Sequence, residues 1–374
     1  MPHSSAFIGL DTHKKTIAVA IADDGRDGEV RYFGQIANDR VAVGKLVKTL
    51  VGKYDRLSFC YEAGPCGYGL QRQIAGLGHD CIVVAPSMVP RKKGDRIKND
   101  RRDARSLARL HRAGEMTAIW VPDEAHEAIR DLVRARTATM ESTRRYRQQL
   151  QGFLLRQGRI YTGKTNWTKS HLQWIREQKF EHPAHYVVIE ENLSGIRGGQ
   201  ERLKRLEQQI VELLPSWSLA SIVSSMQAMR GISLIAAVIL ASEIGDFNRF
   251  DHPGKLVAYL GLSPSEHSSG ERVARGSITK AGSPRARRVL IEGAWAYRLP
   301  PRNRSTGPRL HGLSDAVQEI AWKAQLRICQ RFRLLAKRGK HNNVIVTAVA
   351  REMVCFIWAI AREVSPPSLA TIAA

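Results

Sequence analysis

Residues 6–25 of the chain read AFIGLDTHKKTIAVAIADDG. Two apolar runs, residues 6–10 and 17–22, flank a short polar turn, which is the pattern of two antiparallel strands joined as a hairpin. Residues 30–36 alternate between apolar and polar side chains and indicate a third strand beside them. We therefore expect the chain to begin with a three-stranded meander.

The segments that follow alternate between helical and strand patterns. Apolar spacing predicts a helix over residues 41–51, with Asn38 as its cap. The same reasoning predicts strands at residues 57–61 and 81–85, and helices at residues 68–77 and 100–113. This order, β-β-β-α-β-α-β-α, is that of a ribonuclease H-like domain, an α/β fold.

The middle of the chain lacks strand signals. Residues 124–157 are rich in Arg, Gln and Glu and are predicted to form one long helix, whereas the polar, glycine-containing residues 163–199 are expected to be irregular. Five apolar residues then recur at the heptad spacing of a coiled coil: Leu203, Leu206, Ile210, Leu213 and Leu214. This short run fits an intramolecular helical hairpin as well as a dimeric zipper.

The C-terminal part is predicted to be mainly helical. Residues 229–246 combine a glycine turn with an apolar helix, which suits a helix-hairpin-helix element that offers backbone N–H groups to phosphate. We accordingly expect three domains. They are an α/β domain at residues 1–123, a helical coiled-coil region with an irregular insert at residues 124–215, and a mainly helical domain at residues 216–374.

The chain carries a large excess of positive charge. Its 374 residues include 58 Lys and Arg against 35 Asp and Glu, a net charge of +23. Ten basic residues fall between residues 91 and 112 and eleven between residues 298 and 340, with few acidic partners. A polyanion would offset this self-repulsion, so nucleic acid is the expected partner, ahead of an anionic membrane.

Two further observations bear on the compartment. The five cysteines form no C-x-x-C pair, which argues against a zinc ribbon and a disulfide framework. No apolar run approaches the roughly 20 residues of a membrane span, and the N-terminus lacks the features of a signal peptide. We expect a cytoplasmic protein with no membrane partner.

Four carboxylates are expected where this fold places chemistry. Asp11 ends the first strand, Glu62 ends the fourth, and Asp100 and Asp103 lie one turn apart at the start of the third helix. Neighbouring carboxylates repel each other, and a divalent cation such as Mg²⁺ removes that repulsion while binding a substrate phosphate. Each residue also suits a simpler role: Asp11 as a turn cap, Glu62 as a solvated strand end, and Asp100 or Asp103 as a helix cap.

Two blocks of motifs, one in each half of the chain, resemble those of a known family. They are GLDTHK (9–14), YEAG (61–64), KNDRRDAR (98–105), GIS (231–233), EIGD (243–246), YLGLSPSEHSSGER (259–272), GSITKAG (276–282) and EGAW (292–295). On these residues the chain resembles the DEDD transposases of the insertion-sequence 110 family, and the Piv-type DNA invertases share the pattern. The resemblance covers nearly the whole chain.

The resemblance implies a mechanism. The first domain would be RuvC-like and would hold Mg²⁺, or Mn²⁺ as a substitute, through Asp11, Glu62, Asp100 and Asp103. The second would be a transposase domain whose Ser269 forms a covalent phosphoserine link with DNA, with Ser268 as the alternative nucleophile. A non-coding bridge RNA would guide the enzyme to double-stranded donor and target DNA. The family also implies a homo-oligomer, dimer to tetramer, associated with the nucleoid in the bacterial cytoplasm.

Basic side chains beside these motifs are expected to contact nucleic acid, because Lys and Arg bind phosphate. In the first domain they are Arg91, Lys92, Lys93, Arg96, Lys98, Arg101, Arg102 and Arg105. In the second domain they follow the serine and are Arg272, Arg275, Lys280, Arg285, Arg287 and Arg288. His13 and His267 are candidates for proton transfer.

Three other functions compete with this interpretation. A RuvC-type nuclease would use the same carboxylates to hydrolyse branched DNA without a covalent intermediate. A sugar kinase or chaperone ATPase would need a second glycine-rich phosphate loop and an adenosine loop, neither of which we find in the sequence. A non-catalytic nucleic-acid scaffold would leave the carboxylates without a role.

Overall fold

The computed structural model describes residues 5–90, 99–266, 268–269, 274–302 and 310–365. The chain divides into two compact units, Met1–Val121 and Pro122–Ala374. The second unit contains both the residues assigned from the sequence to the helical middle region and those assigned to the C-terminal domain. The division into three domains therefore stays a prediction.

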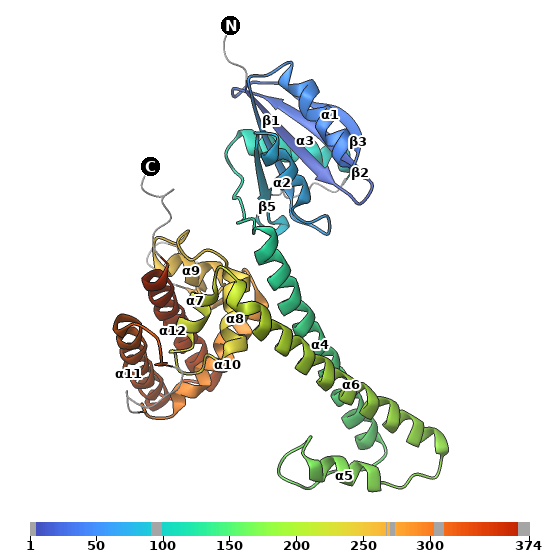
Figure 1. Ribbon diagram of the computed structural model, residues 1–374, viewed down its shortest axis with the longest axis vertical. Coiled ribbons are helices and arrows are strands. Elements are labelled where there is room, and N and C mark those ends of the chain that lie inside the picture. The colour runs from blue at the N-terminus through green and yellow to red at the C-terminus, as the bar shows by residue number, and fades with distance from the viewer. Residues whose placement is uncertain (1–4, 91–98, 267, 270–273, 303–309, 366–374) are drawn as a thin grey trace. The chain divides into compact units, whose positions relative to one another are not determined.

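A five-stranded mixed sheet forms the centre of the first unit (Figure 1). Its strands are β1 (Ser5–Thr12), β2 (Thr16–Asp23), β3 (Val30–Ala37), β4 (Arg56–Glu62) and β5 (Asp80–Val84). They lie in the order β3-β2-β1-β4-β5, with β1 antiparallel to β2, β2 antiparallel to β3, and β4 parallel to both β1 and β5. The strands confirm the predicted element order and are consistent with a RuvC-like domain.

Helices cover both faces of this sheet, and the central strands β1 and β2 are therefore buried on both sides. The helices are α1 (Arg40–Val51), α2 (Gly69–Gly76) and α3 (Asp100–Arg112), with a short 3-10 turn η1 (Pro86–Met88) after β5. Large apolar residues of the sheet pack with α1 and α2, whereas alanines of β2 pack against Ala104 and Ala108 of α3. A Cβ on Gly9 would lie 2.3 Å from the Ala104 carbonyl oxygen, so glycine is what lets α3 approach β1.

The cap of α1 differs from the prediction. The Asp39 side chain caps the helix by accepting a hydrogen bond from the backbone N–H of Ala42 at 2.7 Å. Asn38 instead donates from Nδ2 to the carbonyl oxygen of His13, also at 2.7 Å. Asn and Asp are equally good caps, so two such residues in succession could not be told apart from the sequence.

The second unit is built mainly of helices. They are α4 (Glu124–Arg156), α5 (Lys169–Glu177), α6 (Pro183–Leu213), α7 (Ala220–Met226), α8 (Leu234–Ile244), α9 (Pro253–Tyr259), α10 (Pro284–Ala294), α11 (Asp315–Lys337) and α12 (Asn342–Val364). Short elements between them are η2 (Leu214–Ser216), β6 (Pro264–Glu266), β7 (Arg275–Ile278) and η3 (Trp295–Arg298). Helix α4 confirms the single long helix predicted over residues 124–157.

The expectation that residues 163–199 are irregular is wrong for most of that stretch. It contains α5 and the first half of α6, which packs along α4 (Figure 1). Two of its glycines lie inside α6 at the contact with α4. A Cβ on Gly195 would lie 2.8 Å from the Tyr146 ring, and a Cβ on Gly199 would lie 2.2 Å from Thr143 Oγ1. These glycines permit close helix packing and do not interrupt the helix.

The heptad residues that follow do not form a fully buried seam. Of the five, Ile210 is buried, whereas Leu213 is 43% exposed. Helix α6 packs on α4 of the same chain, which is the intramolecular arrangement that the sequence left open. A zipper between two chains stays a prediction.

Helix α12 corrects the statement that the sequence has no stretch long enough to cross a membrane. It spans 23 residues with a mean hydropathy of 2.0, so by length and composition it could span one. Half of its most apolar stretch is buried, and residues such as Ile345, Val349 and Met353 belong to the main apolar core of the second unit. Helix α12 is thus a core helix, packed against α7, α9, α10 and α11.

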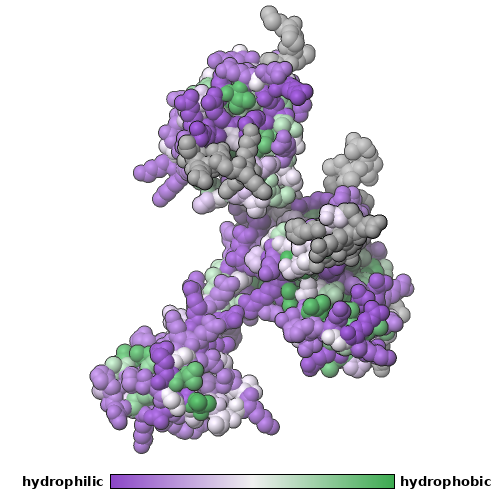
Figure 2. Space-filling view, turned by 180° about the vertical axis from the view of Figure 1, so that it is seen from behind, coloured by the Kyte–Doolittle hydropathy of each residue, from purple (hydrophilic) through white to green (hydrophobic). Residues whose placement is uncertain are grey.

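Outside this core the visible surface is mainly hydrophilic (Figure 2).

The turn before α8 contains Gly231, whose φ of +84° favours glycine, and Ser233 caps α8 by accepting a hydrogen bond from the N–H of Ala236. A Cβ on Gly231 would lie 2.3 Å from the Gly293 carbonyl oxygen of α10. This turn therefore serves packing within the unit, and its role as a helix-hairpin-helix element stays a prediction.

Candidate active site

Strands β1 and β4 end side by side, since Leu10 and Tyr61 are partners in the parallel register. The next residue of each strand is a carboxylate, Asp11 in β1 and Glu62 in β4. Leu10 and Tyr61 are buried in the apolar cluster that includes α1 and α2. Because side chains alternate along a strand, Asp11 and Glu62 lie on the opposite face, which α3 covers.

Helix α3 begins beside the C-terminal ends of these strands, and its first turn contains two more carboxylates. The Asn99 side chain caps the helix by accepting a hydrogen bond from the N–H of Arg102 at 2.9 Å. Asp100 and Asp103 therefore occupy the first turn, where the partial positive charge of a helix N-terminus favours carboxylates. The Asn99 cap fixes the start of the helix and so the positions of Asp100 and Asp103 in its first turn.

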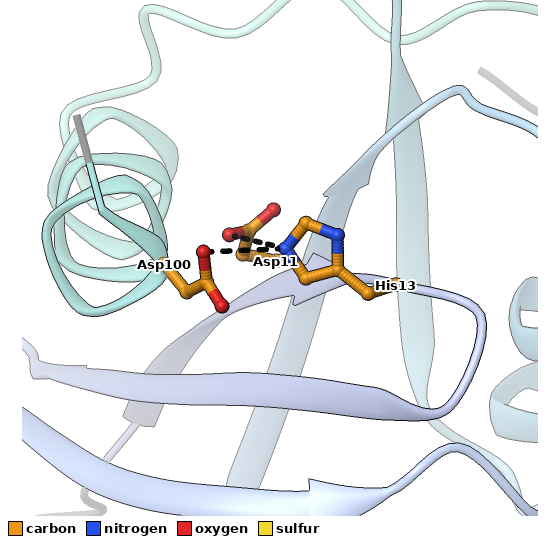
Figure 3. Close-up of side chains that lie close together, drawn as sticks. All are labelled: Asp11, His13 and Asp100. Carbon is orange, nitrogen blue, oxygen red and sulfur yellow. Dashed lines mark ion pairs between the residues drawn. The ribbon is translucent and has the colours of Figure 1, made fainter.

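Three of the side chains at this edge meet at one point (Figure 3). The Nε2 atom of His13 is 3.3 Å from Asp11 Oδ2 and 3.4 Å from Asp100 Oδ1. One ligand atom from each of these residues lies within 4.8 Å of the other two, which is close enough to share an ion. Glu62 and Asp103 do not belong to this group, although Asp103 is near enough to act on the charge of Asp11.

The electrostatics of the group favour a bound cation. Burial raises the pKa of the Asp11 carboxyl, the nearby carboxylates of Asp103 and Asp100 raise it further, and His13 opposes them. Asp11 is 19% exposed, whereas His13 and Asp100 are each about half exposed, so the group opens to solvent and to a substrate. Carboxylate oxygens and an imidazole nitrogen are donors that fit a divalent metal.

The position of His13 comes from the turn between β1 and β2. The backbone N–H of His13 donates to the Thr16 carbonyl oxygen at 2.8 Å, and its own carbonyl accepts the Asn38 hydrogen bond described above. The sequence suggested His13 only as a proton carrier. Its place two residues after Asp11, in the hairpin turn, is the one signal that pointed to His13.

The segment that carries the predicted serine lies in the second unit, between β6 and β7. The Ser268 hydroxyl donates to Glu266 Oε1 at 2.8 Å and accepts from the N–H of Ala274 at 3.2 Å. Ser269 is exposed. His267 and residues 270–273, which include Arg272, lie outside the described residues.

Comparisons with known proteins decide the family. A model described as Transposase IS116/IS110/IS902 family matches residues 223–306, and a transposase model for the DEDD members of the IS110 family matches residues 8–157. A putative transposase y4qE of Sinorhizobium fredii is 52% identical over 362 residues, which are 96% of this chain and 90% of that protein. The transposase for insertion sequence element IS1533 of Leptospira borgpetersenii is 32% identical over 339 residues, 89% of this chain and 97% of that protein.

This chain belongs to the IS110 family of transposases. The transposase is therefore an enzyme that cuts and rejoins DNA, and DNA is its partner. Both matched regions contain residues singled out from the sequence: residues 8–157 include all four carboxylates, and residues 223–306 include Ser268 and Ser269.

The transposase keeps some of the predicted phosphate-binding side chains exposed beside the carboxylates. Arg101 and Arg102 are exposed on α3, and the Arg101 guanidinium lies 5.3 Å from the centre of the Tyr32 ring. Arg105 instead donates to the carbonyl oxygen of Val30 at 2.8 Å, which ties α3 to β3. The remaining predicted residues of this group, Arg91, Lys92, Lys93, Arg96 and Lys98, lie outside the described residues.

The basic residues after the serine also divide into two kinds. Arg287 donates to the carbonyl oxygens of Leu260, Ala281 and Gly282 and so holds the turn before α10. Arg288 is exposed and pairs with Glu292 one turn later at 2.7 Å, and Lys280 is exposed. The side chain of Arg275 lies outside the described part.

The sequence did not reveal an ion pair in the core of the second unit. Glu243, in the EIGD motif of α8, has a side chain only 5% exposed. Arg134 of α4 binds it through two nitrogens at 3.2 and 3.3 Å, and Arg285 of α10 approaches it at 4.0 Å. The motif carboxylate therefore joins three helices, which explains its presence without a catalytic role.

A cavity of about 490 Å³ lies beside these helices, between α4, α8 and α10. Arg136, Arg285 and Arg288 contribute to its wall together with Glu141 and Glu292. Arg285 and Arg288 thus line a concave surface together with acidic side chains, and their contact with nucleic acid stays a prediction.

Proposed function

We propose that the transposase cuts and rejoins insertion-sequence DNA by a covalent mechanism. In this mechanism Asp11, Glu62, Asp100 and Asp103 hold a divalent cation, Mg²⁺ or Mn²⁺, and Ser269 is the nucleophile. The observation that carries the metal part is the meeting of Asp11 and Asp100 at one edge of the sheet, with His13 between them. The serine part rests on the motif resemblance and on the exposure of Ser269.

The chemistry divides between the two units. A bound cation would stabilise the negative charge that builds up on the phosphate during the reaction. The Ser269 oxygen attacks phosphorus and forms a phosphoserine bond, while the bond between phosphorus and one DNA oxygen breaks and that oxygen takes up a proton. Rejoining reverses this exchange with a new DNA hydroxyl, so no water is consumed and the bond energy is retained.

The local structure supports Ser269 over Ser268. The hydroxyl of Ser268 is engaged in two hydrogen bonds, with the Glu266 carboxylate and the backbone N–H of Ala274. An attacking hydroxyl must be accessible and must lose its proton. Both serines are exposed, so the preference for Ser269 rests on the two hydrogen bonds that already occupy the Ser268 hydroxyl.

The experiment that tests the serine is a matched pair of variants. Ser269→Ala is expected to abolish the protein–DNA adduct and strand exchange, whereas Ser268→Ala should retain the adduct. The adduct is measured as a protein-linked DNA fragment on a denaturing gel. Strand exchange at the wild-type rate by Ser269→Ala would exclude the serine mechanism.

A RuvC-type hydrolysis is the second candidate, because the carboxylate group alone is sufficient for it. In that case Ser269→Ala cleaves DNA as fast as the wild type and leaves free 5′ and 3′ ends, with no protein attached. The two candidates therefore predict opposite results for the same variant.

The proposal includes a guide RNA and a homo-oligomer of two to four subunits. The net charge of +23 supports binding of nucleic acid, and the guide RNA and the oligomer rest on the motif resemblance. Sequencing the RNA that copurifies with the transposase tests the guide. One enriched non-coding RNA from the ends of the element is expected, and a random mixture of cellular RNA would contradict it.

A further inference from the structure

His13 lies between two carboxylates, at distances slightly longer than most hydrogen bonds between nitrogen and oxygen. Its Nε2 atom is 3.3 Å from Asp11 Oδ2 and 3.4 Å from Asp100 Oδ1. Hydrogen bonds from nitrogen to oxygen mostly measure about 2.7–3.2 Å, and one ring nitrogen carries at most one proton. The nitrogen faces both oxygens almost equally and is tightly bonded to neither.

The same distances fit ligands of a single ion. Bonds of about 2.1 Å to a metal place two ligand atoms about 3.0 Å apart at a right angle and about 3.4 Å apart at the tetrahedral angle. The separations at His13 fall at the upper end of this span. The third separation, between the two carboxylates, is also within 4.8 Å.

Each of the three side chains is placed by a different element. Asp11 ends a central strand, Asp100 follows the cap of α3, and His13 is held in the hairpin turn by its backbone bonds to Thr16 and Asn38. An ion could therefore bind without a large rearrangement of the chain, as is typical of a preorganised metal site.

We propose that His13 is a metal ligand together with Asp11 and Asp100, and that its imidazole makes the site favour Mn²⁺ over Mg²⁺. The inference rests on the proposed function in one respect, that these carboxylates hold a divalent cation. Mg²⁺ binds oxygen ligands and retains its waters, whereas imidazole nitrogen suits transition metals. A site with one imidazole among oxygen ligands should therefore discriminate between the two ions.

The test uses the full-length transposase, purified without a histidine tag, and Mn²⁺ as the probe. Electron spin echo spectroscopy detects a nitrogen nucleus bonded to Mn²⁺, and a titration gives the affinity. We expect nitrogen modulation in the wild type and none in His13→Gln. The Mn²⁺ affinity of His13→Gln should fall by at least about 10- to 100-fold, which is the loss observed when a metal ligand loses its hydrogen-bond partner. The Mg²⁺ affinity should fall less.

Two further variants serve as controls. His79 lies next to the start of β5, at the opposite end of the parallel strands from Asp11. His79→Gln therefore removes a histidine from the same unit and should change neither the nitrogen modulation nor the Mn²⁺ affinity. His13→Glu replaces the imidazole by a carboxylate. It should bind Mn²⁺ without nitrogen modulation and should show a smaller preference for Mn²⁺ over Mg²⁺ than the wild type.

Two results would overturn the inference. They are wild-type protein that binds Mn²⁺ without nitrogen modulation, and unchanged Mn²⁺ affinity in His13→Gln. Asp11→Asn separates this failure from failure of the proposed function. If Asp11→Asn loses Mn²⁺ and His13→Gln does not, only the role of His13 is wrong, whereas if Asp11→Asn binds Mn²⁺ like the wild type, the carboxylate site is wrong as well.

Discussion

At Asp11, burial and the neighbouring carboxylates raise the pKa of one carboxyl group, and His13 opposes them without reversing the shift. Burial is the larger cause, and with Asp103 and Asp100 it raises the pKa above the ordinary value of 3.8. The folded state therefore holds the proton more tightly than the unfolded state does. Stability falls as the pH rises from the unfolded pKa to the folded pKa, and the full cost is present at neutral pH.

We predict that Asp11→Asn stabilises the metal-free transposase at neutral pH, because the amide removes a charge that burial disfavours. The gain should vanish below the unfolded pKa of 3.8, where the wild-type carboxyl is protonated in both states. Thermal unfolding in EDTA at both pH values measures it, with exposed Asp27→Asn as the control. The rate of metal-dependent DNA cleavage by the same variant should be lower by at least about 10- to 100-fold. A less stable variant at neutral pH would contradict the account.

At the scale of the element, two neighbouring glycines in α6 show how the contact with α4 is made. Gly199 faces Thr143 of α4, whereas a Cβ on Gly198 would meet nothing within 4 Å. Thr143 is 3% exposed and its hydroxyl donates to the Thr139 carbonyl at 2.8 Å, so it has little room to move. The two glycines should therefore respond oppositely to the same substitution.

We predict that Gly199→Ala destabilises the second unit by about 1–3 kcal/mol, as overpacking of a tight contact typically does. Gly198→Ala should instead stabilise it by about 0.5–1 kcal/mol, because alanine loses less conformational freedom than glycine in a helix. Urea unfolding followed by circular dichroism measures both. Equal effects of the two substitutions would show that α6 does not pack on α4 through this face.

These glycines also show where prediction from the sequence stops. The strands of the first unit could be predicted because their apolar runs end at clear turn residues, and Asp11 and Asp100 could be placed because strand ends and helix starts meet at one edge. The sequence could not show that a glycine in α6 faces another helix, because helix propensity treats every interior glycine as a breaker. The sequence singled out His13 for proton transfer but could not place it between Asp11 and Asp100, since the path of a hairpin turn depends on a tertiary contact, here with Asn38.

The contact between α4 and α8 should make stability depend on pH. His126 of α4 is 3% exposed, and its Nε2 lies 3.0 Å from the Ser242 carbonyl oxygen of α8. Burial lowers its pKa below the ordinary value of 6.5. As the pH falls through 6.5 the unfolded chain takes up a proton that the folded state resists, so stability is lost on the acid side.

We predict that His126→Gln has a smaller loss of unfolding free energy below pH 6.5 than the wild type. One titrating group contributes at most about 1.4 kcal/mol per pH unit, so the difference between the two slopes should not exceed that value. Urea unfolding at several pH values measures the slopes. Exposed His311→Gln, in the same unit, should keep the wild-type slope, and a wild-type slope in His126→Gln would contradict the prediction.

For the whole molecule, net charge is the property that governs DNA binding. A charge of +23 implies many contacts with phosphate, and each contact releases counterions from the DNA. The structure shows that the basic residues are not equivalent in this respect. Arg105 and Arg287 donate hydrogen bonds to backbone carbonyl oxygens, whereas Arg101 lies over the Tyr32 ring and is exposed beside the carboxylates.

We predict that the affinity for double-stranded DNA falls steeply with salt and that Arg101→Ala lowers the slope of log K against log salt by about 0.9, the value for one phosphate contact. The control is Arg56→Ala, which removes the same charge at the start of β4, the end of the strand opposite to Glu62. There Arg56 pairs with Asp80 at 3.2 Å. Because both variants lose one positive charge, a difference between them reports contact and not net charge. Fluorescence anisotropy over a range of salt concentrations measures the slopes. Equal slopes for the two variants would mean that DNA does not reach the edge where Asp11 and Asp100 meet.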